Sequence, residues 1–350
     1  MGKGNITEMN AVDFFCGGGG MTRGLLNAGI HVQFGLDINP ACQHTYEYNN
    51  GIPYLCRDIS SITPEELTRD YPVLLNNGDL LLVGCAPCQP FSKQRRSDHE
   101  HISTNLLDDF GNFVRALDPV CVLIENVPGI QNRGHVVFER FLTLLDEMHY
   151  HTFYTVVNAQ NYGVPQKRKR LVLIAAQDFF PDEPPVTHGG GLLPYMTVRD
   201  AIERFPAIEA GGTNEAFLNH SASSLSDINL RRIEATPHDG GGRLDWPPEL
   251  VLACHNHGHN GHTDVYGRMS WDSVSPTLTS KCFSLSNGRF GHPEQNRAIS
   301  LREAAALQSF DDDYQFFGST QEIGRQIGNA VPVLLAQRIG EYILAHHQQN

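Results

Sequence analysis

The stretch DFFCGGGGMTRGLLNAG, residues 13–29, decides the fold, because it joins a predicted strand to a predicted helix through four successive glycines. Apolar residues dominate 11–16, as in a buried β-strand, and a helical pattern follows the glycines and ends near Ala28-Gly29. Glycines at such a junction tolerate positive φ and let a ligand approach the backbone closely. A strand, a glycine loop and a helix in this order predict an α/β fold with a ligand site at the loop.

The glycine spacing does not fit the dinucleotide-binding fingerprint, which needs glycines at i, i+2 and i+5. Counted from Gly17 the third position is Thr22, and counted from Gly18 it is Arg23. The loop therefore lacks that phosphate-binding signature, and a nucleoside without phosphates suits it better.

Two acidic residues at predicted strand ends support the same interpretation. Asp37 closes the predicted strand 32–37, where a carboxylate can accept both hydroxyls of a ribose. Asp58 ends the predicted third strand and can accept a proton of an adenine amino group. S-adenosylmethionine is the common nucleoside of this kind. The alternative is a tight structural turn with two solvated aspartates.

Strands and helices alternate through the first half of the chain. A helix is predicted to begin at Thr63, in a capping box with Glu66. Further strands, short and apolar as buried parallel strands are, are predicted at 80–83, 120–124 and 171–175. This alternation predicts a Rossmann-like, doubly wound, mostly parallel sheet with ligands at the carboxyl ends of its strands.

The second half of the chain begins with a different composition. Residues 181–265 are rich in Pro, Gly, His and Asn and have weak periodicity, which predicts a smaller, loop-rich domain or, alternatively, a flexible insertion. Helix signals return at Ser300 and Ser319, each followed three residues later by Glu. The expected domains are a catalytic, cofactor-binding one of residues 1–180 and 301–350, and a small one of residues 181–300.

The composition, with 40% hydrophobic and 19% charged residues, is that of a soluble globular protein. The first residues have no apolar signal core, and no apolar run is long enough to span a membrane. We therefore expect a cytosolic protein with reduced cysteines. The eight cysteines are scattered along the chain rather than spaced as a disulfide framework.

The net charge of -13 argues against a polyanionic partner, but the charge is unevenly distributed. Residues 93–180 carry ten basic and ten acidic side chains and form the least acidic segment. Its basic residues include Lys93, Arg95, Arg96 and the run 167–170. A local basic face of this kind can bind phosphates on an acidic protein.

Cys85 and Cys88, in the stretch VGCAPCQPFSK of residues 83–93, directly follow a predicted strand. A redox pair would need a helix start here, and Gln89-Pro90-Phe91 is a poor one. A zinc site would need a second pair, and the candidates around Cys254 have irregular spacing. A buried core cysteine remains an alternative, but a lone nucleophile at Cys88 is the best interpretation.

Glu125 directly follows an apolar strand in VCVLIENVPG, residues 120–129. Burying a carboxylate costs free energy unless it is paired or neutral, so this position indicates a function, with an exposed strand end as the alternative. If the strands before Cys88 and Glu125 are parallel neighbours, both side chains project into the same crevice.

Taken in order, these motifs resemble those of the DNA (cytosine-5) methyltransferases of the bacterial restriction-modification type. The resemblance covers most of the chain, except about residues 181–262. Asp37 stands where the family often has glutamate and can do the same job, and Ala86 stands where a second proline is common. The motifs that carry the resemblance are DFFCGGGG, LDIN, RDIS, APCQPFS, ENV, QKRKR, RMSWDSVSPTLTS and IGNAVP.

The resemblance implies the S-adenosylmethionine-dependent methyltransferase fold, with residues 181–300 as a target-recognition domain and with no metal. The catalytic residues that it implies are Cys88, Glu125, Arg168 and Arg170. The cofactor-binding residues that it implies are Phe15, Gly18, Gly20, Asp37, Ile38, Asp58, Ile59, Pro87, Asn329 and Ala330.

The resemblance also implies a mechanism. The Cys88 thiolate adds to C6 of cytosine, which makes C5 nucleophilic enough to take a methyl group. Glu125 contacts N3 and the exocyclic amine, Arg170 holds O2, and Arg168 orders the site. The base must leave the stack of the duplex, because C6 is inaccessible inside it.

The same resemblance implies double-stranded DNA as substrate, and a monomer in the prokaryotic cytoplasm, close to the nucleoid. A restriction endonuclease acting on the same site, without a stable complex, is the expected companion. Side chains of the small domain are expected to read bases, although each candidate is equally suited to stabilising a loop. These candidates are Arg243, His255, Asn256, His257 and Asn260.

Two rival functions remain, one on the same scaffold and one of a different class. A tRNA cytosine-5 methyltransferase has the same scaffold and a Cys-Phe-Thr that Cys282-Phe283-Ser284 resembles, but the residues after it resemble the DNA branch. A catalytically silent DNA-binding protein would have no use for an intact Cys88 and Glu125.

Overall fold

The computed structural model describes residues 8–86, 106–252 and 264–348. By their contacts, the residues form two compact units. The first consists of Met1–Asn158, Lys169–Val186 and Val333–Asn350, and the second of Ala159–Arg168 and Thr187–Pro332. Of the range 301–350, expected in the catalytic domain, only the part from Val333 onward belongs to the first unit.

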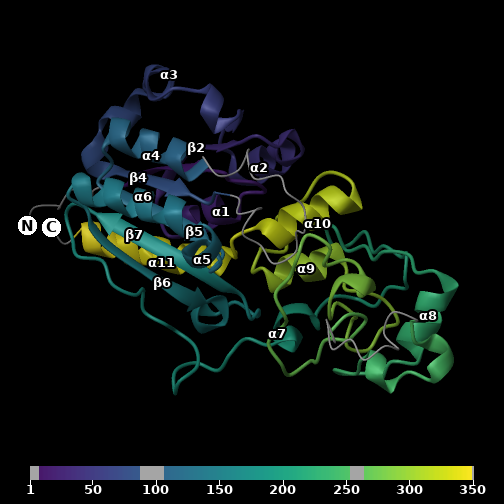
Figure 1. Cartoon of the computed structure of the whole chain (residues 1–350). Helices are drawn as coiled ribbons and strands as arrows, with labels where there is room; N and C mark the ends of the chain where they lie inside the picture. The colour runs from purple at the N-terminus through teal and green to yellow at the C-terminus, as the bar shows by residue number, and fades with distance from the viewer. Residues whose placement is uncertain (1–7, 87–105, 253–263, 349–350) are drawn as a thin grey trace, which may run out of the picture. The chain divides into compact units, whose positions relative to one another are not determined.

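The first unit is built on a seven-stranded sheet with the order β3-β2-β1-β4-β5-β7-β6 (Figure 1). Strands β1 to β5 pair in parallel, which confirms the mostly parallel sheet. The strands are β1 (Asn10–Phe14), β2 (His31–Asp37), β3 (Tyr54–Cys56), β4 (Leu80–Gly84), β5 (Cys121–Asn126), β6 (His151–Asn158) and β7 (Lys169–Ala176).

Strand β7 corrects one expectation, because it runs antiparallel to both of its neighbours. Its apolar run 171–175 was expected to be a parallel strand. Only residues 159–168 separate β6 from β7, and a parallel pair needs a crossover of a dozen or more residues. The short connection therefore forces the antiparallel arrangement, which places the start of β7 beside the end of β5.

Helices cover both faces of this sheet. Figure 1 shows α4 and α6 on one face and α1 and α11 on the other. In α4 the buried Leu107, Phe110, Val114 and Leu117 recur at helical spacing, so one side of the helix packs on the apolar core. The helices are α1 (Gly20–Asn27), α2 (Gln43–Asn50), α3 (Pro64–Asp70), α4 (Leu106–Leu117), α5 (Ile130–Arg133), α6 (His135–Glu147) and α11 (Val333–His347).

The second unit is rich in loops, and isolated β-bridges join some of its described segments. A small core around Ile233, Trp246 and Tyr266 holds part of it together. Its helices are α7 (Val198–Ile202), α8 (Asp227–Glu234), α9 (Leu301–Leu307) and α10 (Thr320–Asn329). The capping boxes predicted at Thr63, Ser300 and Ser319 all form, at the starts of α3, α9 and α10. Across the described parts of both units, every helix is too short or too polar to span a membrane.

Candidate active site

The ends of four strands meet at one edge of the sheet in the first unit. The order of the strands reverses between β1 and β4, and ligands of doubly wound folds bind at the carboxyl ends of strands at such a point. The glycine loop follows β1, Cys85 follows β4, and Glu125 is the second-last residue of β5. Because β7 is antiparallel, Arg170 near its start is at the same edge.

The glycine loop begins with a residue in an unusual conformation. Phe15 has a φ of 63°, which is uncommon for a residue with a side chain. Its amide donates a 2.6 Å hydrogen bond to the Leu36 carbonyl of β2, which holds it there. Gly17 and Gly19 follow with φ of 51° and 87°, and Gly19 caps α1. Such strained backbone is common at ligand sites.

Asp37, at the end of β2, is fixed by the backbone around it. One carboxylate oxygen accepts the Gly17 amide at 3.0 Å, and the other accepts the Asn39 amide at 2.8 Å. Burial raises the pKa of Asp37, and these hydrogen bonds oppose the rise. The next residue, Ile38, leaves 65% of its surface exposed. An exposed isoleucine beside a positioned carboxylate suits an apolar ring joined to a sugar.

Asp58 was expected at the end of the third strand, but β3 ends two residues earlier, at Cys56. Asp58 instead caps a short 3-10 helix by accepting the amide and the hydroxyl of Ser60 at 3.0 and 2.8 Å. Ile59 is only 3% exposed and belongs to the apolar core. Asp58 is thus half-buried with one oxygen already engaged, whereas Ile59 faces protein.

Glu125 and Arg170 form an ion pair. Arg170 Nε lies 2.8 Å from Glu125 Oε1, and the two side chains are 13% and 9% exposed. A carboxylate this far from water needs a partner, because leaving a buried charge unpaired costs several kcal/mol. Arg170 supplies that partner and also donates through Nη1 to the Lys169 carbonyl at 2.8 Å.

The residue after Glu125 ties β5 to the chain segment that leads to Cys88. The Asn126 side-chain amide donates to the Ala86 carbonyl at 3.1 Å, and its oxygen accepts the Val127 amide at 2.7 Å. Cys85 N in turn donates to the Phe14 carbonyl at 3.2 Å. These bonds fix the backbone entering the cysteine loop against both neighbouring strands.

Arg168 and Gln166 lie in the second unit and are held by its backbone. Arg168 is 2% exposed, and its guanidinium donates to the carbonyls of Leu278, Gly328 and Ala330 at 3.0 to 3.1 Å. Gln166 accepts the Leu278 amide at 2.9 Å and donates to the Leu307 carbonyl. Both side chains therefore fasten loop segments to one another.

Asn329 and Ala330 stand at the end of α10. Asn329 is exposed, whereas Ala330 is buried and its carbonyl accepts from Arg168. A Cβ at Gly328 would lie 2.2 Å from the Thr279 carbonyl oxygen, so this motif needs glycine for close backbone contact.

Several predicted site residues lie outside the described residues. They are Pro87, Cys88, Lys93, Arg95, Arg96, Cys254, His255, Asn256, His257 and Asn260. Where residues are described, no cluster of His, Cys, Asp and Glu is suited to hold a metal ion.

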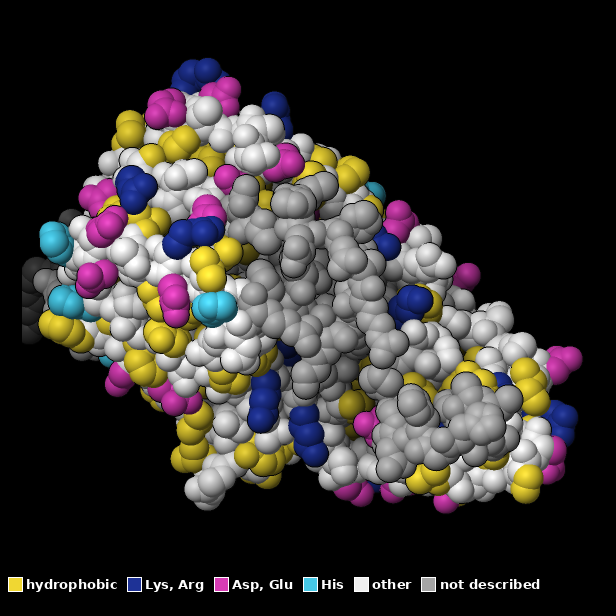
Figure 2. Space-filling model, in the orientation of Figure 1, with side chains coloured by type: hydrophobic (Ala, Val, Ile, Leu, Met, Phe, Trp, Pro, Cys, Tyr) yellow, Lys and Arg dark blue, Asp and Glu magenta, His cyan; other side chains and the backbone are white. Residues whose placement is uncertain are grey.

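Cys282 of the rival tRNA motif is completely buried, and burial raises the pKa of its thiol to about 12. Figure 2 shows described basic side chains standing among acidic ones on the face that it draws.

A buried polar group beneath the glycine loop was missed by the sequence analysis. Asp13 of β1 is completely buried, and one of its oxygens accepts the Thr22 hydroxyl at 2.7 Å. That hydroxyl also lies 2.9 Å from the Tyr46 hydroxyl, while the second Asp13 oxygen has no hydrogen-bond partner. Burial raises the pKa of Asp13 to about 7. The sequence contained a signal for this buried group, because Asp13 is an acidic residue inside the apolar run 11–16.

The structure is that of a doubly wound α/β protein with candidate ligand-binding residues at the ends of its strands. A family model for C-5 cytosine-specific DNA methylases matches residues 9–345. The chain belongs to this family.

Relatives agree with that assignment. The chain is 44% identical to "Type II methylase M.HgiDII" of Herpetosiphon aurantiacus over 95% of this chain and 94% of that one. It is 33% identical to "Type II methyltransferase M1.HphI" of Haemophilus parahaemolyticus, over 96% and 87% of the two chains. It is thus a cytosine-5 DNA methyltransferase of the restriction-modification type.

Solved structures share the fold. A prophage-encoded DNA modification methyltransferase from E. coli matches with a TM-score of 0.74 and 22% identity, over 97% of this chain and 99% of that one. The S. pombe Dnmt2 methyltransferase matches with a TM-score of 0.64 and 17% identity, over 97% and 98%.

Asp13 is expected to make stability depend on pH. Its pKa in the folded protein lies above the unfolded value of 3.8, so the folded state holds an extra proton between about pH 4 and pH 7. Stability therefore falls as pH rises through this window and stays low above it. Relative to D13N, the wild type should lose about 2.6 kcal/mol between pH 5 and pH 8, most of it below pH 7, where the slope is about 1.4 kcal/mol per pH unit. Urea unfolding at both pH values measures this.

The matched control is D146N, which removes an exposed acid from α6 and should follow the wild type. If D13N and the wild type change in parallel from pH 5 to pH 8, Asp13 does not titrate in this range.

Proposed function

We propose that this protein transfers a methyl group from S-adenosylmethionine to C5 of a cytosine flipped out of a specific double-stranded DNA site. The observation that carries the proposal is the ion pair of Glu125 and Arg170, beside the segment that leads to Cys88. A paired acid and cation at a sheet edge suit recognition of a polar ring with an amine and a carbonyl. Membership of the cytosine-5 methylase family supports the choice of ring.

The cofactor site is assigned to the glycine loop and the end of β2. Bound S-adenosylmethionine supplies an electrophilic methyl group on a sulfonium. Asp37 keeps lone pairs free for ribose hydroxyls while two amides hold its carboxylate in place. Ile38 offers an exposed apolar face to the adenine ring. The remaining residues assigned here by family resemblance are Phe15, Gly18, Gly20, Asp58, Ile59, Pro87, Asn329 and Ala330.

The reaction divides among the residues at the ends of β4, β5 and β7. The Cys88 thiolate adds to C6, and the electron pair of the C5–C6 double bond would then form the new bond from C5 to the methyl group, while the S–CH3 bond breaks and its electron pair stays on the sulfur of the demethylated product. Glu125 shares a proton with N3 and accepts a hydrogen bond from the exocyclic amine, while Arg170 donates to O2. Water takes the C5 proton, and the electron pair of the C5–H bond restores the C5–C6 double bond and expels the Cys88 thiolate.

Cys88 is preferred to Cys85 as the nucleophile for an electrostatic reason. Burial raises the pKa of the Cys85 thiol well above its usual value, and the nearby carboxylates of Asp13 and Glu125 raise it further. A thiol that resists ionisation is a poor nucleophile. Cys88 lies three residues further along the chain.

The two predicted arginines receive different roles. Arg170 reaches the Glu125 carboxylate and is assigned to the substrate. Arg168 is assigned to positioning, because its Nη1 and Nη2 already donate to three backbone carbonyls. The exposed Lys167 and Lys169 are suited to phosphates.

The second unit is the proposed target-recognition domain. Its loops offer side chains for reading base edges, and the chain acts as a monomer on duplex DNA at the nucleoid. The type II names of its relatives support a role as the modification enzyme that protects a site from a separate restriction endonuclease.

Replacing the two cysteines separately tests the nucleophile. C88S should abolish methyl transfer and covalent trapping on 5-fluorocytosine DNA, because a serine hydroxyl adds poorly to C6. C85S should keep much of both, since Cys85 is not expected to ionise. Gel-shifted covalent complexes and methyl incorporation measure the outcome. Trapping that survives C88S but is lost in C85S would overturn the assignment.

Matched lysine substitutions distinguish the roles of Arg168 and Arg170. R170K keeps a charge beside Glu125 but loses the planar fork, so the single-turnover rate on saturating enzyme should fall about 10- to 100-fold with little change in melting temperature. R168K replaces two separate nitrogens, Nη1 and Nη2, by a single ammonium that cannot span the same three carbonyls, so it should destabilise the protein by about 2 kcal/mol. An unchanged rate for R170K would assign Arg170 to the scaffold.

Calorimetry tests the cofactor. The protein should bind S-adenosylmethionine and its demethylated product but not NAD, because the glycine spacing lacks the dinucleotide fingerprint. D37N should weaken binding about tenfold or more, since a charged hydrogen-bond acceptor is lost. D146N serves as the control of equal charge. Heat from NAD, with none from S-adenosylmethionine, would contradict the assignment.

A further inference from the structure

Five buried arginines lie in the described part of the second unit, and four of them have acceptors. Buried cations normally have partners, because a guanidinium taken out of water loses its hydration. The five are Arg168, Arg243, Arg268, Arg297 and Arg302.

Four of these arginines donate to several acceptors inside the protein. Arg268 donates to four backbone carbonyls and to the Asn296 side chain. Arg297 makes a two-point ion pair with Glu303 at 2.7 and 2.8 Å. Arg302 donates to three carbonyls through Nη1, and Arg168 donates to three through Nη1 and Nη2, although Nε of both and Nη2 of Arg302 have no hydrogen-bond partner. At least one nitrogen of each of the four guanidiniums is therefore tied to the protein.

Arg243 has fewer partners than the other four. It is 8% exposed, and its Nε has no hydrogen-bond partner, as is also true of Nε in Arg168 and Arg302. Unlike theirs, its guanidinium makes no hydrogen bond or ion pair with any described residue. Nothing in the described structure explains why a cation should be buried here. A group that stays unsatisfied in the free protein is a candidate for an acceptor supplied by a ligand.

The backbone that carries Arg243 is firmly held. Arg289 donates to the carbonyls of Gly240 and Gly241 at 2.8 and 3.1 Å, and Asp245 accepts the Gly242 amide at 2.9 Å. A Cβ at Gly241 would lie 2.3 Å from the Pro237 carbonyl oxygen, so glycine is required there.

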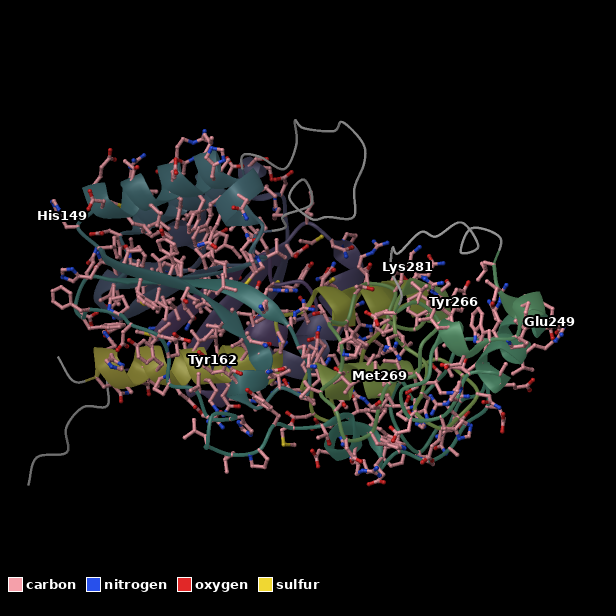
Figure 3. The ribbon with its side chains drawn as sticks, turned by 60° about the horizontal axis from the view of Figure 1, so that its bottom comes forward. His149, Tyr162, Glu249, Tyr266, Met269 and Lys281 are labelled. Atoms are coloured by element: carbon pink, nitrogen blue, oxygen red, sulfur yellow. The ribbon has the colours of Figure 1, made fainter. Side chains whose placement is uncertain are left out.

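The other side of Arg243 is anchored by the core of the unit. Trp246 packs against Tyr266, which Figure 3 labels, and donates to the Thr236 hydroxyl at 2.8 Å. Between Arg243 and Trp246, Leu244 leaves 79% of its surface exposed. The segment thus presents an unpaired guanidinium and an exposed apolar side chain from a fixed backbone.

We propose that Arg243 reads a guanine of the methylated DNA site through O6 and N7. This inference rests on the proposed function. A guanidinium on a fixed backbone matches the two acceptors of a guanine edge, which is the commonest specific arginine contact in the major groove. The neighbouring Leu244 is suited to apolar contact with a thymine methyl group rather than to a phosphate.

The test begins with the site itself. The wild type, R243A, R243Q and R231A are expressed in cells without other cytosine methylation, and methylated sites are sequenced. R231A removes an exposed cation of the same charge from α8 and is the matched control. The wild type and R231A should share one site. R243A should tolerate other bases at one guanine position, with discrimination reduced about 5- to 150-fold, and R243Q should shift that position toward adenine.

Purified proteins give a second readout. A duplex with 7-deazaguanine at that position lacks the N7 acceptor and should lower the single-turnover rate of the wild type but not that of R243A. The melting temperature of R243Q should stay close to that of the wild type, since no hydrogen bond inside the protein is lost and glutamine keeps much of the buried side chain.

The outcomes are distinguishable. R243A could instead weaken binding to all DNA sequences equally and flatten the salt dependence of the DNA affinity by about one unit of slope. That result would make Arg243 a phosphate contact and overturn the proposal. Unchanged specificity in both R243A and R243Q would also overturn it. A wild type that binds S-adenosylmethionine but methylates no DNA would instead overturn the proposed function, and the assignment of Arg243 with it.

Discussion

Parallel pairing of β1 with β4 and of β4 with β5 is the constraint on which the candidate site depends. Parallel strands end at the same edge, so three chain segments that are far apart in sequence leave the sheet together. Antiparallel β7 adds a fourth segment at that edge by starting where the others end. Each contributes one kind of group, namely a glycine loop, a cysteine segment, a carboxylate and a guanidinium. The hydrogen bond from the Asn126 side chain to the Ala86 carbonyl then holds the segment that leads to Cys88 next to the strand that carries Glu125.

Arginine serves three different purposes in this protein, and its surroundings decide which. Where backbone carbonyls surround the guanidinium, as at Arg168, it cross-links loops in a unit that has few regular elements. Where a carboxylate lies next to the guanidinium, as Glu125 does at Arg170, the arginine forms an ion pair at the edge of the sheet. Arg243, whose Nε has no hydrogen-bond partner, is the residue proposed to meet an acceptor from outside the protein. A loop-rich unit needs the first use because side chains must replace the hydrogen bonds of sheets and helices.

The alternation of strands and helices and the helix starts could be predicted because glycine loops, apolar runs and capping boxes are local signals. The direction of β7 could not be read from its residues, since an apolar run looks the same either way, and the short connection after β6 was the better guide. Strand β6 itself, with its alternating exposure, was not predicted. The site was partly predictable: Glu125 was expected from the cost of burying it, whereas its pairing with Arg170 depends on that strand direction. Helices α9 and α10 were predicted, but the unit that they pack into depends on long-range contacts.

The division of the chain has a consequence for how such enzymes can change during evolution. The polypeptide passes between the two units four times, after residues 158, 168, 186 and 332. Neither unit is therefore encoded by one continuous stretch of gene, and a single recombination event cannot exchange one unit whole. A double crossover that replaces residues 187–332 would still leave 159–168 behind, with Gln166 and Arg168 bonded to backbone of the replaced stretch. New sequence preference should thus arise more readily by substitution within loops, while the backbone acceptors around these two side chains stay in place.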